Sequence, residues 1–319
     1  MENVIYLSHG KHLTGGYLHE KQFAQTLCEH LGLSPSAYIE KRRWEYFETP
    51  LDYLKLFTWS FKEGYGSQNI CVARIALPVL LRNLFNKKKV WVVWHYFDPT
   101  DKKQTILKIW YSILLFLARW ISPQKLQIVC VAPFWKNYFE KKIGINKVLY
   151  FPNFFDSKQY IPYRNLPKKK QIHLGQESFK NSRDVIDLSS WLTALGYACY
   201  FSTNAPEKAG DFETYEIRYF KTFEAYLSEM AKSEYTLALP YINEGWNRIA
   251  HESFLVGTQV IGYKKGGLGD LLDGANGIIV ENIEEVLEAI KSKKIKQINQ
   301  EFLFHFDVEE AKKYLMKKK

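Results

Sequence analysis

The stretch Leu239–Val280, LPYINEGWNRIAHESFLVGTQVIGYKKGGLGDLLDGANGIIV, decides the fold predicted for this chain. An apolar strand is expected over Tyr235–Pro240, then a polar loop, a helix opening near Trp246 and a second strand over Thr258–Tyr263. Two glycine-rich turns are expected to follow: Gly266–Gly267 and Asp273–Gly277. A strand, loop and helix in this order point the positive amino end of the helix at the edge of a parallel sheet, where a diphosphate is well placed.

Two glutamates flank the start of this helix. Glu244 ends the loop together with Gly245, a residue that allows a ligand close to the backbone. Glu252 lies about two helical turns further on, and Gly257 is placed to end the helix. A carboxylate in the second turn is able to reach past the phosphates to the paired hydroxyls of a sugar, so the pattern indicates a nucleotide-sugar site.

Taken in order, these residues resemble the Glu-x7-Glu region of the family-four retaining glycosyltransferases of the GT-B fold. The resemblance implies an α/β protein with two Rossmann-like domains of parallel strands facing across a cleft, and a C-terminal helix that returns to the first domain. It implies that Glu244 meets the hydroxyls of the donor sugar and that Glu252 binds the nucleotide ribose. The N–H groups of Trp246, Asn247 and Arg248 would hold the diphosphate, with Asn247 where the family commonly has glycine. The alternative is an ordinary α/β domain in which the same residues only cap helices and form turns.

The order of elements along the chain alternates between strand and helix, which predicts parallel sheets in both halves. The segment Val148–Asp156, VLYFPNFFD, resembles the Pro-Asn-x-x-Asp element with which the family leaves its first domain. We therefore expect an acceptor-side domain over 1–160, a donor-binding domain over 161–300, and a helix over 301–319 that crosses back.

Three residues of the first half are candidates for the same site. Gly15 and Gly16 lie in a loop expected between a strand at Val4–Ser8 and a helix at His19–Leu31. The resemblance implies that the backbone of this loop touches the donor phosphates or the acceptor. His95 follows the expected strand Val90–Trp94, and a histidine at the carboxyl end of a parallel strand faces the ligand crevice. The family uses such a histidine to bond the transferred sugar.

The resemblance also implies a basic pair that grips the diphosphate. Lys180 matches its lysine, but Gln176 stands where the arginine is expected, so Arg183 or Arg248 is left to supply that charge. Positive charge at the leaving diphosphate lowers the barrier to sugar transfer, and one well-placed donor contributes about 3 kcal/mol. The predicted catalytic residues are thus His95, Lys180 and Glu244. We expect no metal and no cofactor, with a UDP- or GDP-linked sugar as the substrate.

Charge and apolar character single out the first half. Residues 1–160 contain 22 Lys and Arg against 12 Asp and Glu, whereas residues 161–319 contain 22 of each kind. The apolar segment Thr105–Ile121 is expected to be a buried helix or one that lies on a membrane surface. We expect a cytoplasmic protein with no signal peptide, four buried reduced cysteines, a glycan or lipid-linked acceptor and no nucleic-acid partner. Peripheral contact with an anionic membrane is an open alternative.

Two other functions compete with sugar transfer. One is a non-catalytic basic protein on a degenerate GT-B fold, binding nucleic acid or membrane, which the formal net charge of +10 favours. The other is a different GT-B enzyme, such as a nucleotide-sugar epimerase or a phosphorylase. Against nucleic-acid binding, no nucleic-acid motif is visible in the sequence, and the second half, which contains the glycines, is neutral.

Overall fold

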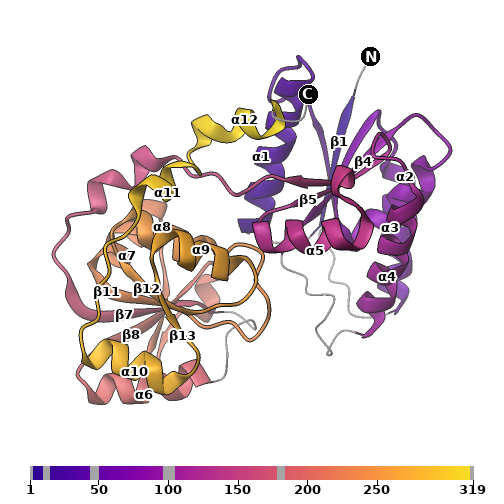
Figure 1. Cartoon of the computed structure of the whole chain (residues 1–319). Helices are drawn as coiled ribbons and strands as arrows, with labels where there is room; N and C mark the ends of the chain where they lie inside the picture. The colour runs from indigo at the N-terminus through magenta and orange to yellow at the C-terminus, as the bar shows by residue number, and fades with distance from the viewer. Residues whose placement is uncertain (1–2, 10–14, 44–49, 96–104, 178–183, 317–319) are drawn as a thin grey trace. The chain divides into compact units, whose positions relative to one another are not determined.

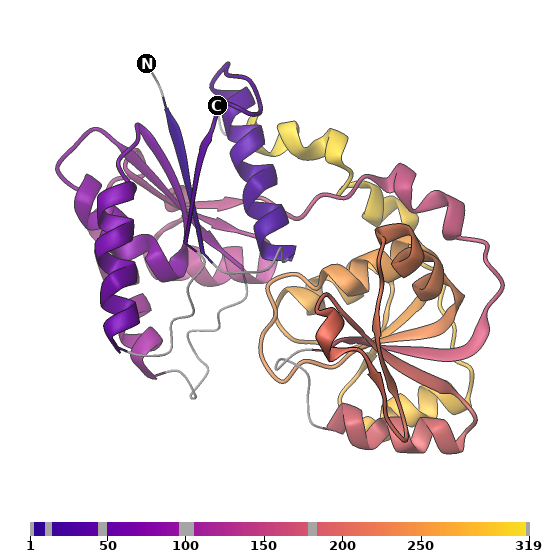
Figure 2. The ribbon, with the colours of Figure 1, turned by 180° about the vertical axis from the view of Figure 1, so that it is seen from behind.

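The chain forms two compact units, each with its own sheet covered by helices (Figures 1 and 2). The computed structural model describes all residues except 1–2, 10–14, 44–49, 96–104, 178–183 and 317–319. Unit 1 is Met1–Phe154 together with Glu309–Lys319, and unit 2 is Phe155–Val308. Unit 2 begins and ends there, rather than at 161 and 300, because its two ends pair: the Phe155 N–H donates to the Phe306 carbonyl, and the Val308 N–H to the Phe155 carbonyl.

Unit 1 contains a sheet of six parallel strands in the order β2-β1-β3-β4-β5-β6. Its strands are β1 (Val4–His9), β2 (Ile39–Arg43), β3 (Gln68–Val72), β4 (Lys89–Trp94), β5 (Leu126–Cys130) and β6 (Val148–Tyr150). Its helices are α1 (Gly15–His30), α2 (Pro50–Glu63), α3 (Ala73–Asn83), α4 (Thr105–Trp120), α5 (Pro133–Ile143), α12 (Ala311–Met316) and the 3-10 turns η1 (Ile145–Lys147) and η5 (Val308–Glu310). Strand order reverses between β1 and β3, where open sheets of this kind bind ligands.

The C-terminal segment returns to unit 1, as the fold predicted. Ala311 and Leu315 of α12 join the core formed by β1 and α1, and Tyr314 packs edge-on against Tyr150 with ring centroids 5.7 Å apart. Lys312 pairs with Glu29 of α1 at 3.3 Å. The last helix is short because the chain from residue 300 divides into α11, η5 and α12 in place of one continuous helix.

Unit 2 contains a seven-stranded sheet in the order β13-β12-β11-β7-β8-β10-β9. Its strands are β7 (Lys169–Gln176), β8 (Ala198–Thr203), β9 (Gly210–Asp211), β10 (Glu216–Tyr219), β11 (Ser233–Ala238), β12 (Gln259–Tyr263) and β13 (Ile278–Val280). All described pairs are parallel except β9 with β10, which lies at the edge. The order reverses between β7 and β11, so the carboxyl ends of these two strands mark the ligand-binding position of this sheet.

Helices cover both faces of this second sheet (Figure 1). They are α6 (Asp184–Ala194), α7 (Phe223–Lys232), α8 (Arg248–Leu255), α9 (Gly267–Ala275), α10 (Ile283–Lys291), α11 (Gln300–Phe304) and the 3-10 turns η2 (Ser157–Gln159), η3 (Ile161–Tyr163) and η4 (Pro206–Lys208). Side chains of α6 and α10 share one core cluster with β7, β8 and β11. The predicted parallel α/β architecture is confirmed in both units.

Two sequence-based expectations about local structure were wrong, and one pair of strands was not predicted. Gly15 and Gly16 are the first residues of α1, so the predicted loop is shorter and the helix begins four residues earlier. The stretch Gly266–Gly277 is mostly helix, because the apolar residues of α9 at 268, 271, 272 and 275 all turn inward. In that stretch Asn276, with φ 64°, forms the left-handed end of α9. The edge strands β9 and β10 were not predicted, since they are short, mostly non-apolar and contain no fully buried residue.

The apolar segment α4 is half-buried. Tyr111, Leu114 and Ala118 face the core, whereas a stripe of large apolar side chains faces outward: Ile109, Ile113, Phe116 and Trp120. Among the described residues, no helix is long and apolar enough to cross a bilayer. The four cysteines are buried free thiols, as expected.

Candidate functional site

The candidate site of unit 2 is built on the loop between β11 and α8, at the ligand-binding edge of the sheet. The helix begins at Arg248, two residues later than predicted, because the Asn247 side chain caps it by accepting the Ala250 N–H at 2.9 Å. This cap gives a physical reason for asparagine where the resembled family commonly has glycine. The amino end of α8 keeps the partial positive charge that suits a diphosphate.

Trp246 anchors this loop with its side chain. The indole N–H donates to His251 Nδ1 at 3.1 Å, and the indole packs on Phe306 with ring centroids 4.9 Å apart. His251 in turn stacks on Phe155 at 4.0 Å. Because the Trp246 side chain is buried, only its backbone is suited to meet a ligand.

Glu244 is held in place through its backbone. Its carbonyl accepts the Gly267 N–H at 2.9 Å, and residues 244 and 266 form an isolated parallel bridge. Gly266 adopts φ 58° and ψ −139°, and a Cβ at this position would lie 2.4 Å from the Glu244 carbonyl oxygen. Only glycine permits this approach, so the Gly-Gly pair serves to hold Glu244 rather than to form a free loop.

Glu252 lies in a polar cluster in the second turn of α8. Arg248 Nη2 is 3.5 Å from Glu252 Oε1, and the Tyr226 hydroxyl donates to Oε2 at 3.3 Å. Burial raises the pKa of Glu252, while Arg248 and the Tyr226 hydrogen bond oppose that rise. Arg248 also lies over the Phe155 ring, 4.4 Å from its centroid. Arg248 is therefore the ion-pair partner of Glu252. Its charge is already engaged there, so it does not simply take the place of the arginine that the resembled family has at position 176.

Gln176 is exposed at the carboxyl end of β7. It follows Gly175, whose φ of 89° bends the strand, and a Cβ there would lie 3.2 Å from the Leu237 carbonyl oxygen. Lys180 and Arg183 lie outside the described residues. Gln176 thus stands at the predicted edge, next to β11.

The candidate residues of unit 1 are brought together by α1 and β4. His95 follows β4, and a Cβ on Gly16 would lie 3.4 Å from His95 Cδ2, so the first turn of α1 passes over the imidazole ring. Gly15 begins the same turn, whose backbone N–H groups belong to the positive end of a 16-residue helix. The unit 1 candidates share one edge of one sheet, and those of unit 2 share another.

Two partners of the predicted site residues escaped the sequence analysis. Glu20 Oε1 lies 2.8 Å from His95 Nε2, and Tyr226 bonds Glu252 as described above. Glu20 falls on the same helical face as the buried Phe23, Ala24 and Leu27. A carboxylate on an apolar helical face was the available signal, because such a group is costly to bury unless it has a partner.

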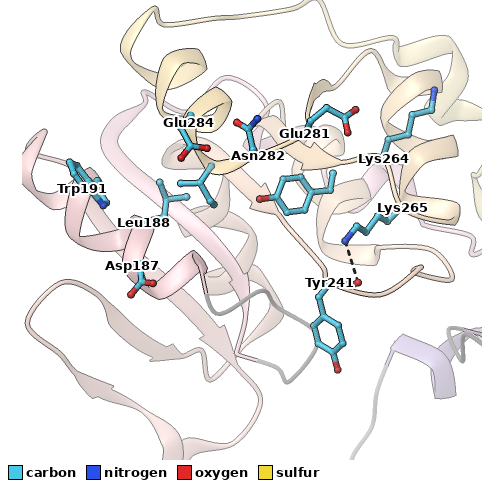
Figure 3. A pocket seen from close by; sticks show the side chains of 11 residues that line it. Asp187, Leu188, Trp191, Tyr241, Lys264, Lys265, Glu281, Asn282 and Glu284 are labelled. Carbon is cyan, nitrogen blue, oxygen red and sulfur yellow. Dashed lines mark hydrogen bonds between the residues drawn. The ribbon is translucent and has the colours of Figure 1, made fainter. Parts of the chain in front are cut away.

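A separate hollow of about 670 Å³ lies between the middle of α6 and the amino end of α10 (Figure 3). Its lining includes Trp191 and Tyr241 together with charged side chains of both signs: Asp187, Glu281, Glu284, Lys264 and Lys265. None of the predicted site residues that the structure describes lines it. The hollow is therefore distinct from the predicted site at the amino end of α8. Within the described part of the chain, no three His, Cys, Asp or Glu side chains gather as a metal site requires.

Comparison with known proteins establishes the fold. No family model and no curated protein matches the sequence. The solved structure of HepE from Anabaena, bound to UDP and glucose, matches with a TM-score of 0.69 at 12% identity, covering 99% of each chain. An α,α-trehalose-phosphate synthase (UDP-forming) from Burkholderia vietnamiensis matches with a TM-score of 0.70 at 8% identity, covering 99% of this chain and 96% of that one.

A glycosyltransferase from Rickettsia africae gives a TM-score of 0.63 at 14% identity, covering 99% of this chain and 94% of that one. These likenesses extend over both units and confirm the expected GT-B fold. At such low identity they speak for the fold, and the function must be argued from the site.

Proposed function

Starting from this fold, we propose that the chain is a retaining, metal-independent glycosyltransferase that moves a sugar from a nucleotide-sugar donor to a glycan or lipid-linked acceptor. One observation supports this proposal above the others: two carboxylates, Glu244 and Glu252, flank the capped amino end of α8 at the ligand-binding edge of the sheet. A nucleoside diphosphate sugar needs a positive centre for its phosphates and acceptors for the hydroxyls on either side. The loop offers both.

In this proposal the diphosphate lies at the amino end of α8, where the helix dipole and the backbone N–H groups of the first turn favour negative charge. Glu252 accepts hydrogen bonds from the ribose hydroxyls, and Glu244 accepts them from the donor sugar. Hydroxyl donors stabilise the ionised form of a buried carboxylate, so a bound ribose would offset the desolvation that raises the pKa of Glu252.

The reaction breaks the bond between the anomeric carbon and the diphosphate oxygen and forms the new glycosidic bond on the same face of the sugar. The acceptor hydroxyl loses its proton to the departing phosphate oxygen. Lys180 and the α8 amino end would stabilise the negative charge that grows on the leaving group. His95 would bond a hydroxyl of the transferred sugar.

The outer face of α4 supports a lipid-linked acceptor and contact with an anionic membrane. Its exposed stripe ends at Trp120, 79% of which is accessible. Residues 73–147 contain 14 Lys and Arg against three Asp and Glu, and Arg119 and Lys147 lie at the end of the stripe, where Lys147 Nζ bonds the Ala118 carbonyl. Apolar side chains that enter the interface, surrounded by cations that meet lipid phosphates, are the features of interfacial helices.

Nucleotide binding is the first test. UDP or GDP at about 100 times its Kd should stabilise the protein by about 2.7 kcal/mol, visible as a rise in melting temperature. Glu252→Ala should abolish most of the rise. The control Glu281→Ala, an exposed glutamate of the same unit, should leave it intact. A rise that Glu252→Ala retains would show that the site assignment is wrong. No response to UDP, GDP, ADP or dTDP, together with salt-dependent DNA binding, would favour the non-catalytic alternative.

Membrane contact is tested separately by flotation with vesicles. We expect binding to phosphatidylcholine vesicles only when they contain phosphatidylglycerol, with loss of binding at high salt. The double variant Phe116→Ser, Trp120→Ser should lose binding, and Trp191→Ser, an exposed tryptophan of unit 2, should keep it. Equal binding by all three proteins would remove α4 as the contact surface.

A further inference from the structure

Behind His95 lies a hydrogen-bonded chain that the proposed reaction does not by itself explain. His95 Nε2 is 2.8 Å from Glu20 Oε1, and the Tyr6 hydroxyl donates to Glu20 Oε2 at 2.6 Å. Glu20 is only 5% exposed, and Tyr6 is fully buried in the centre of the sheet. One carboxylate therefore uses each of its oxygens for a different partner.

The direction of these bonds follows from the chemistry of the three groups. Burial raises the pKa of Tyr6, so its hydroxyl keeps its proton and donates it, while the Ser8 side chain supplies a hydrogen bond to the phenol oxygen. A carboxylate oxygen accepts hydrogen bonds, so His95 Nε2, 2.8 Å from Glu20 Oε1, is the donor in that bond. His95 therefore carries hydrogen on Nε2, and in the neutral ring Nδ1 has a lone pair.

The ring is also fixed in orientation. His19 meets it edge-on with ring centroids 5.1 Å apart, and His19 Nε2 donates to the Phe151 carbonyl at 2.8 Å, which fixes His19 itself. Gly16 passes over the Cδ2 and Nε2 side of the His95 ring. Gly16, His19 and Glu20 are three and four residues apart on one face of α1, so a single helix turn holds the imidazole.

We infer that Glu20 is a positioning residue: it binds His95 through Nε2–H and leaves Nδ1 as the atom that accepts a hydrogen bond from a hydroxyl of the transferred sugar. The sugar ligand in this inference rests on the proposed function, but the tautomer of the His95 ring does not depend on that function. A histidine that accepts, rather than donates, selects a substrate with a hydroxyl donor at this point. Such outer partners typically change the activity of the group they orient by 10- to 100-fold.

The first measurement is independent of activity. In protein labelled with ¹⁵N-histidine, at pH 8, the His95 signals assigned with His95→Gln should show the Nε2–H tautomer with a downfield proton protected from exchange. Glu20→Ala should lose that protected proton, whereas Tyr6→Phe should keep it, since the Glu20 to His95 bond remains. The matched control is Glu29→Ala. Glu29 also lies on α1, but it pairs with the exposed Lys312, so its removal should leave the His95 signals unchanged. Hydrogen on Nδ1 in the unaltered protein would overturn the inference.

The second measurement is turnover with the nucleotide sugar that the binding screen selects. Glu20→Ala should lower kcat 10- to 100-fold while the Kd of the free nucleoside diphosphate stays unchanged, because His95 meets the sugar and not the nucleotide. Glu20→Gln, which keeps an acceptor oxygen, should recover part of the loss. Full turnover by folded Glu20→Ala would refute the positioning role. If the unaltered protein turns over no donor, the proposed function fails, and the NMR tautomer still decides whether Glu20 holds the ring as inferred.

Discussion

Gly266→Ala should damage the site through one backbone contact. The added Cβ would lie 2.4 Å from the Glu244 carbonyl oxygen, which is 0.6 Å inside the 3.0 Å that such contacts respect. The backbone at 266 also has φ 58° and ψ −139°, which costs a residue with a side chain about 1–3 kcal/mol. Overpacking against a fixed carbonyl adds about 1–3 kcal/mol. The two effects together destabilise unit 2 by about 3 kcal/mol or more.

For a domain of this size, such a loss lowers the melting temperature by roughly 6–12 °C. Relief of the clash must move Glu244 away from Gly266 by about 0.6 Å. Because a misplacement of about 1 Å costs roughly 100-fold in rate, we expect turnover to fall about tenfold in the protein that remains folded.

Calorimetry and donor turnover measure the two effects in Gly266→Ala and in a matched control, Gly196→Ala. Gly196 also has a positive φ, of 81°, but its Cβ would meet only the flexible end of Lys170. The control should lose only the strain, about 1 kcal/mol, and no activity. A Gly266→Ala protein that melts and turns over like the control would refute the view that this glycine holds Glu244.

Three further predictions concern unit 2. Burial lowers the pKa of His173 from 6.5 to about 3, so its stabilising effect is complete above pH 6.5 and is lost as the pH falls toward 3. At pH 5 the loss is about 2 kcal/mol, and His173→Gln should flatten the fall in urea midpoint between pH 7 and 5. Asn247→Ala should cost about 1 kcal/mol in urea unfolding, and Asn247→Asp, which still caps α8, should not. Tyr226→Phe should raise the pKa of Glu252 further by removing a hydrogen bond to its carboxylate. As the pH falls, the affinity for UDP, measured by calorimetric titration, should therefore begin to weaken at a higher pH than in the unaltered protein. An unchanged pH dependence would show that Tyr226 does not act on the site.

Much of the fold was predictable because burial leaves a local pattern. The strands expected at Val4–Ser8, Val90–Trp94 and Thr258–Tyr263 were each predicted to within one residue at either end, since each is a short apolar run between clear breaks. The helix Gly267–Ala275 was missed because glycine is usually a turn signal. Gly274 instead makes room for Phe302, whose ring would lie 2.2 Å from an added Cβ. That reason belongs to a neighbouring helix and has no trace in the local sequence.

The sequence alone determined that the chain alternates strands and helices, that a helix begins after Glu244, and that Glu252 lies in the second turn of that helix. Periodicity, caps and glycine positions are properties of neighbouring residues, so they can be recognised along the chain. Tertiary structure alone decided that Glu20 meets His95 across 75 residues of sequence and that Gly266 fixes the Glu244 backbone. Such contacts depend on how strands are ordered in a sheet and how closely two backbones approach, and residues distant in sequence set both.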